Sequence, residues 1–123
     1  SIELMNSFEY LEVWKQSVQL SAELYTYFSE SKEYGFKDQI TRAALSIPSN
    51  IAEGCEHDSV NEKLRYLNYA KASSGELQTQ LKVGEIAGFI TTEQAEQWNQ
   101  QARKFSAMLV GLKKSLQRKG SKG

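Results

Sequence analysis

Near the carboxyl end of the chain, apolar residues recur at alternating steps of three and four. The series is Ala95, Trp98, Ala102, Phe105, Leu109, Leu112 and Leu116. Steps of three and four place side chains on one face of an α-helix. A sustained series of this kind is typical of helices that pack nearly parallel to their neighbours. The series therefore predicts a long helix over about residues 92–118 in a helical bundle, with a frayed tail after it.

The rest of the chain predicts three further helices, over about residues 10–28, 36–55 and 60–87. The first has two apolar stripes, a main one of Leu11, Trp14, Val18, Tyr25 and Phe28 and a second one of Val13, Leu20 and Leu24. A helix with two stripes is expected to touch more than one neighbour. The apolar face of the third comprises Leu67, Ala70, Ser74, Leu77, Leu81 and Gly84. Capping pairs at Ser59–Glu62 and Thr91–Gln94 mark the starts of the third and fourth helices, and Gly88 marks the end of the third.

The only proline, Pro48, falls inside the apolar series of the second helix. Proline removes one backbone hydrogen bond and clashes with the preceding turn. Because helical periodicity continues on both sides, we predict one kinked helix rather than two helices. Ser46 and Asn50 are close enough in sequence to bond the freed backbone groups, and Gly54 is expected to end the helix.

These four helices predict an all-α, antiparallel, up-down-up-down four-helix bundle, formed as a single domain over residues 1–123. One proline and eight glycines suit long helices better than a turn-rich β fold. The chain has one cysteine, no apolar run of about 20 residues, and no apolar block within residues 1–10. We therefore expect a cytoplasmic protein without a signal peptide, a membrane span or an intrachain disulfide.

The zero net charge conceals a strong asymmetry. All 15 acidic residues lie at or before Glu96, and seven of the 15 basic residues lie after it. Such a division can mark a segment for an anionic partner. The candidate nucleic-acid-binding residues are Lys104, Lys113, Lys114, Arg118 and Lys119. An alternative is a solvated helix end whose cations complement the helix dipole.

The segment 53–58 is rich in potential ligands, since it contains Glu53, Cys55, Glu56, His57 and Asp58. A di-iron bundle site needs a histidine from each of two helices, and His57 is the only histidine. We therefore expect no metal, no cofactor and no enzyme activity, although a small enzyme or metal protein using residues 53–58 stays an alternative. A second alternative is a helix-turn-helix DNA-binding protein that uses residues 47–67.

The segment from Gln39 to Gly54, QITRAALSIPSNIAEG, resembles the central motif of the 23S rRNA intervening-sequence protein family, also called four-helix bundle proteins. Further segments agree in the same order: FEYLEVWKQSVQLSAELY, YLNYAKASSGELQTQL, AGFI and MLVGLKKSL. The resemblance extends from Phe8 to about Leu116. Its motif residues, to which we assign structural roles, are Arg42, Ser46, Pro48, Asn50, Glu53, Gly54 and Glu76.

The resemblance implies a bacterial four-helix bundle that assembles as a homopentamer. A related branch, the accessory proteins of diversity-generating retroelements, forms basic pentamers that bind a reverse transcriptase and nucleic acid. The zero net charge of this chain departs from that branch. We therefore expect a non-enzymatic homo-oligomeric scaffold of the intervening-sequence family, with RNA or a nucleic-acid enzyme as its partner.

Overall fold

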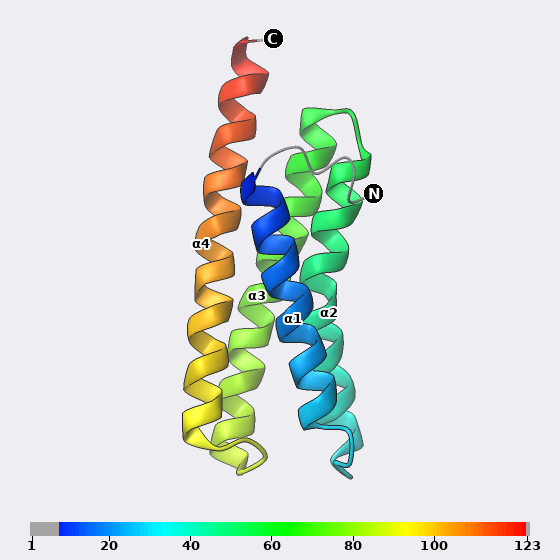
Figure 1. The fold of residues 1–123 in the computed structure, drawn as a ribbon, viewed down its shortest axis with the longest axis vertical. Helices are drawn as coiled ribbons and strands as arrows, with labels where there is room; N and C mark the ends of the chain where they lie inside the picture. The colour runs from blue at the N-terminus through cyan, green and yellow to red at the C-terminus, as the bar shows by residue number, and fades with distance from the viewer. Residues whose placement is uncertain (1–7, 123) are drawn as a thin grey trace.

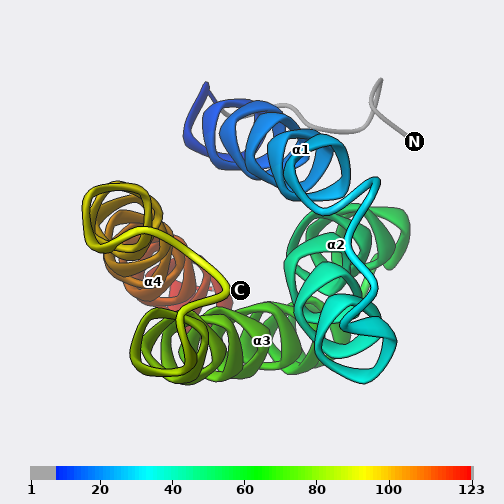
Figure 2. The same ribbon diagram turned by 90° about the horizontal axis from the view of Figure 1, so that it is seen from below.

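The computed structural model describes the backbone of residues 8–122 and the side chains of residues 10–119. Its helices are α1 (Phe8–Tyr27), α2 (Tyr34–Glu56), α3 (Val60–Ala87) and α4 (Thr92–Lys122). Each helix runs antiparallel to the one before it, and α4 extends past the others at its carboxyl end (Figure 1). The end view shows the helices at four corners in chain order (Figure 2). The predicted up-down-up-down bundle is thus confirmed.

The observed helix boundaries lie close to the predicted ones, with one correction at the carboxyl end. Helix α3 has the predicted limits, and α1 and α2 each begin two residues earlier than predicted. The predicted frayed tail is wrong as far as Lys122, because α4 continues to that residue. None of the helices in this described part of the chain is both long enough and apolar enough to cross a membrane.

The core confirms the apolar series predicted for α3 and α4. All six residues predicted for the inner face of α3 are buried. The α4 series is buried from Ala95 to Leu112, and Leu116 is half-buried against the core. Both series lie on a single stripe, so the helical period alone identifies the face that packs inward.

Of the two apolar stripes predicted on α1, the second is buried more completely than the first. The buried residues on α1 include Val13, Leu20 and Leu24 from the second stripe, together with Ser17 and Ser21. Val18 and Tyr25 from the predicted main stripe are exposed by 39% and 44%. Helix α1 therefore keeps an apolar flank outside the bundle.

Helix α2 is continuous through Pro48, as predicted. The Asn50 side-chain amide donates to the Ser46 carbonyl at 2.8 Å, one of the backbone groups just before the proline. The Ser46 hydroxyl, in contrast, contacts the Ser73 hydroxyl of α3. Gly54 does not end the helix, because α2 continues to Glu56. A Cβ at Gly54 would lie 3.2 Å from Tyr66 Cβ, so this glycine permits a close approach of α3.

Small residues on α3 bring it close to both neighbours. Ser73 contacts α2 through Ser46. The fully buried Ser74 hydroxyl donates to the Ala102 carbonyl of α4 at 2.7 Å and accepts from the Ser106 hydroxyl at 2.9 Å. In the run of small residues 72–75, only Ser73 and Ser74 make these contacts, since Ala72 and Gly75 are exposed.

Predicted caps fix the turn between α3 and α4. The Thr91 side chain accepts from the Gln94 backbone N–H at 3.2 Å at the start of α4. The other predicted cap is at the start of α3, where the Ser59 side chain accepts from the Glu62 N–H at 3.3 Å. Gly88 adopts a left-handed conformation with φ of 81°. The N–H groups of the next two residues, Phe89 and Ile90, bond the Gly84 carbonyl. The chain thus reverses within a few residues and places α4 directly beside α3.

A pair of glycine substitutions tests the turn. We expect Gly88→Ala to lower the free energy of unfolding by about 1 kcal/mol, because a Cβ is strained in the left-handed region. Gly75→Ala should instead raise it by about 0.5–1 kcal/mol, since that site is helical and a Cβ added there would have no atom within 4 Å. Urea unfolding at matched protein concentration measures both changes. Equal effects of the two substitutions would contradict this account.

Candidate nucleic-acid interface

The predicted basic residues of α4 lie on two different flanks of that helix. Lys113 follows Ser106 by two turns, and Ser106 bonds Ser74 of α3. Lys113 is also one turn before Gln117, and Gln117 lines a shallow groove together with residues of α3. Lys113 is therefore on the α3 side of α4 and is half-buried, while Lys114 beside it is exposed.

Helix α3 adds a lysine that the charge pattern of the sequence did not indicate. The Ser106 hydroxyl bonds the side chains of both Gln78, at 3.4 Å, and Ser74, at 2.9 Å, so Ser106 lies between the levels of these two α3 residues. Because α3 and α4 are antiparallel, the position two turns after Ser106 lies between the levels of the positions two turns before Gln78 and Ser74. Lys71 thus lies within about one turn of the level of Lys113, across the groove between the helices. We call Lys71, Lys113 and Lys114 the basic band.

The basic band lies between two helical segments that contain no carboxylates. Residues 63–75 of α3 and 97–119 of α4 contain no acidic residue. Acidic side chains do occur at the same end of the bundle, around the connection between α2 and α3. There Glu62 Oε1 lies 3.3 Å from Arg65 Nη1, and Glu53 Oε1 lies 3.9 Å from His57 Nε2. Each of these two carboxylates therefore lies near a basic or ionisable side chain of the α2–α3 connection, Arg65 or His57, rather than near the basic band.

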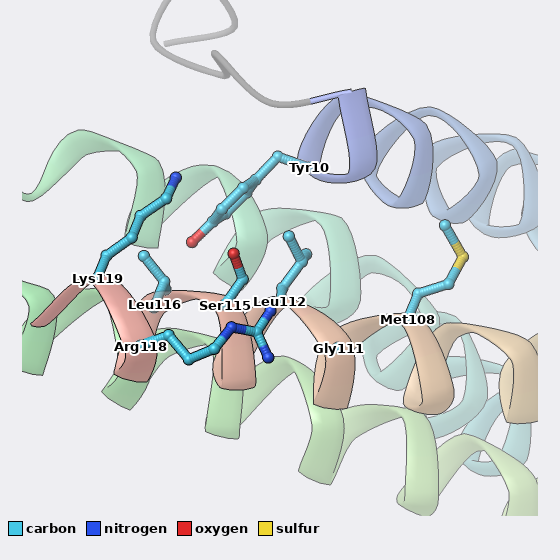
Figure 3. Close-up of a pocket in the computed structure, with 8 residues that line it drawn as sticks. All are labelled: Tyr10, Met108, Gly111, Leu112, Ser115, Leu116, Arg118 and Lys119. Atoms are coloured by element: carbon cyan, nitrogen blue, oxygen red, sulfur yellow. The ribbon is translucent and has the colours of Figure 1, made fainter. Parts of the chain in front are cut away.

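The other flank of α4 borders a cavity at the amino end of α1 (Figure 3). Its volume is about 400 Å³, and its lining is Tyr10, Met108, Gly111, Leu112, Ser115, Leu116, Arg118 and Lys119. Lys104 precedes Met108 by one turn and therefore lies on the same flank. Burial raises the pKa of the Tyr10 phenol, so the phenol stays neutral at physiological pH. The charged side chains among those that line the cavity are both cationic.

The motif residues make contacts that are mostly within α2 and α3. Arg42 Nε donates to the Asp38 carboxylate at 3.0 Å, and the Gln80 amide donates to Glu76 at 3.2 Å. Pro48 is buried, whereas Glu53 is exposed near His57. Together with the Ser46, Asn50 and Gly54 contacts described above, these interactions agree with a structural role, which stays a prediction.

The potential ligands of the segment 53–58 are divided between the core and the surface. His57 stacks on Tyr66 of α3 with ring centroids 5.0 Å apart, whereas Cys55 is buried in the core. Burial is the main cause that raises the pKa of the Cys55 thiol, which disfavours the nucleophilic thiolate. Across the described residues, no three histidine, cysteine, aspartate or glutamate side chains come together in a way that could hold a metal ion.

The structure also argues against the helix-turn-helix alternative. That motif joins two helices at about 90–120°, whereas α2 and α3 lie antiparallel along their lengths (Figure 1). Ile47, Ile51 and Leu67, which the alternative would place in the DNA-binding unit, are fully buried in the bundle core. The segment 47–67 is therefore one hairpin of the bundle.

Comparisons with known proteins agree with this fold. Residues 9–111 match the family model described as 23S rRNA-intervening sequence protein. A similar crystal structure is that of a protein of unknown function from the S23 ribosomal protein family of Bacteroides thetaiotaomicron. It is 26% identical with a TM-score of 0.78, and the alignment covers 83% of this chain and 98% of that one. No curated protein matches. The family match ends before Lys113, Lys114, Arg118 and Lys119.

Proposed function

Because the chain belongs to the 23S rRNA-intervening sequence protein family, we propose that it is a non-enzymatic, homopentameric bundle that binds RNA. Its proposed RNA-binding surface is formed by α4 and the adjacent side of α3. Its proposed role is that of a scaffold that holds several copies of this surface together. RNA binding and assembly are supported by different observations.

The observation behind RNA binding is the basic band in its acid-free surroundings. Lysine and arginine side chains bind phosphates mainly by releasing condensed counterions, so each additional cation adds to the affinity. Nearby carboxylates would cancel this attraction, and segments 63–75 and 97–119 contain none. Arg118 and Lys119 extend the positive surface around α4 to the cavity beside Tyr10. A chain with zero net charge can therefore still present one locally positive surface.

The observation behind self-association is the apolar flank of α1, which we define as Leu11, Trp14, Val18 and Tyr25. Leu11 and Trp14 are half-buried against the core, and Val18 and Tyr25 are exposed. The opposite, polar flank of α1 faces α4, because the Trp98 Nε1–H donates to Glu23 at 3.2 Å. Leu45 on the neighbouring α2 is also exposed, by 45%. Monomeric proteins rarely leave extended apolar surface in water. The family resemblance supplies the pentamer as the expected number of copies.

The absence of catalysis is part of the proposal and is supported by the chemistry of the described side chains. The lone cysteine is buried, the lone histidine stacks on a tyrosine, and these two groups belong to different parts of the packing. Neither residue lines the cavity beside Tyr10, the groove between α1 and α4, or the groove between α3 and Gln117. A nucleophile, a base and a substrate pocket are therefore not brought together among residues 10–119.

The direct test combines light scattering with an RNA-binding titration of the untagged protein. We expect a mass near five times 13.9 kDa. We also expect fluorescent single-stranded RNA to bind with an affinity that falls steeply with salt. Contacts of four or five cations with phosphates predict a slope of about −3 to −3.5 for log affinity against log salt. A monomeric mass would contradict the assembly, and RNA binding that is absent at low salt would favour a protein partner instead.

A further inference from the structure

A cluster of aromatic side chains and one arginine lies on the surface near the start of α3. The ring planes of His57 and Tyr66 lie 12° apart in a stack, and the Tyr66 and Tyr69 rings meet edge to face. The Arg65 guanidinium lies over both tyrosines, at 5.5 Å and 5.7 Å from the ring centroids. Tyr69 is the most accessible ring, with 45% of its surface exposed. We call these four residues the aromatic cluster.

The aromatic cluster is held in place before any ligand binds. Arg65 Nε donates to the Tyr69 hydroxyl at 3.1 Å, and Arg65 Nη1 bonds Glu62 at 3.3 Å. Tyr66 packs closely against Gly54 of α2. Groups that are already ordered lose less entropy on binding, so a flat ligand could stack here at low cost.

The aromatic cluster and the basic band lie on opposite sides of one exposed helix face. Tyr66 is on the α2 side of α3, because it packs against Gly54, whereas Lys71 is on the α4 side, two turns before Gln78, which bonds Ser106. The outward stripe between them follows steps of four and three: Asn61, Arg65, Asn68 and Ala72. All four are exposed, and none is acidic. The distance across an α-helix with its side chains is about 10–12 Å, which a few nucleotides can span.

We propose that a single strand of RNA crosses the outer face of α3, stacks one base on the aromatic cluster and places its neighbouring phosphates on the basic band. This inference rests on the proposed RNA binding and specifies the form of RNA that the site takes. Aromatic rings and arginine planes bind unpaired bases by stacking. In a duplex the bases are already stacked and paired, so a double strand reaches only the basic band. The amides of Asn61 and Asn68 lie along the path of the strand.

The test compares a 12-nucleotide RNA with a blunt duplex of the same sequence. Tyr69→Leu should weaken single-strand binding by about tenfold, because one stacked base is lost. Duplex affinity and the salt slope should not change, because no phosphate contact is removed. Tyr69→Phe keeps the ring and should retain most of the affinity. Lys71→Gln should instead reduce the salt slope by about 0.7.

Tyr34→Leu is the matched control, because this tyrosine is 69% exposed and is the first residue of α2, at the end of that helix away from its connection to α3. It should leave RNA binding unchanged. Unchanged single-strand affinity in Tyr69→Leu, or equal binding of duplex and single strand by the unaltered protein, would overturn this inference but not RNA binding itself. Equal affinity for single-stranded DNA would overturn the assignment to RNA. If no salt-sensitive binding is seen with any probe, the proposed function itself fails.

Discussion

Replacing Lys113, Lys114, Arg118 and Lys119 together by glutamine is expected to weaken RNA binding by roughly a hundredfold at physiological salt. Each phosphate contact of a single strand contributes a slope of about 0.7, which makes each cation worth about fourfold near 0.15 M salt. Four cations multiply to a factor on the order of a hundred. The slope of log affinity against log salt should fall by close to 3 in the same variant.

The fold should tolerate this fourfold change. Lys114, Arg118 and Lys119 are exposed and Lys113 is half-buried, while the apolar series of α4 stays intact. Fluorescence anisotropy with labelled single-stranded RNA measures the affinity, and circular dichroism checks the helix content.

A control variant separates local charge from total charge. Lys32, Lys37, Arg42 and Lys82 lie outside the acid-free segments, and replacing all four by glutamine changes the net charge by the same amount. RNA affinity should change little in this control, because all four lie outside the proposed surface, and Arg42 and Lys82 pair with Asp38 and Glu85. Equal losses in the two variants would mean that only net charge matters. Undiminished affinity in the first variant would place the RNA site elsewhere.

The sequence was sufficient to predict most of the fold, because three helices each show one dominant apolar stripe. The family match and the solved relative agree with the resemblance that the motifs indicate. Helix α1 has two apolar stripes, so the pattern did not indicate which one faces the core, and its buried face includes two serines, Ser17 and Ser21. Ser17 is buried with its hydroxyl donating to the Trp14 carbonyl at 3.1 Å, so a local bond satisfies it in the core. A pattern of apolar residues cannot detect such a position.

The candidate site was only partly predictable, for a different reason. Charge along the chain identified α4, but Lys71 is 42 residues before Lys113 in the sequence. Their proximity depends on the antiparallel register that the contacts of Ser74, Gln78 and Ser106 fix. The aromatic cluster also needed the fold, because His57 meets Tyr66 only after the chain turns between α2 and α3. Residue types in the sequence can suggest phosphate binding. The path of an RNA strand can be inferred only when the structure shows which helix faces carry these residues.

The apolar flank of α1 gives the second large expected effect. Val18→Glu should shift the mass from near five times 13.9 kDa towards that of the single chain. Val18 is 39% exposed in the isolated bundle, so a carboxylate there remains in water and the monomer should still fold. In an assembly that covers this flank, the same carboxylate would be buried without a partner. Burying an unpaired charge is strongly unfavourable, so association should weaken far more than folding.

Gln19→Glu provides the matched control for this substitution. Gln19 is the next residue of α1, is exposed, and lines a shallow groove with α4 rather than the apolar flank. The added charge is the same, but its position is on the polar flank, so the mass should stay near that of the assembly. Light scattering over a range of concentrations measures both variants. If Val18→Glu keeps the full mass, α1 is not the interface. If both variants dissociate, the effect comes from the added charge. RNA affinities should then be compared at equal oligomeric state. Several copies of the basic band bind one RNA more tightly than a single copy does.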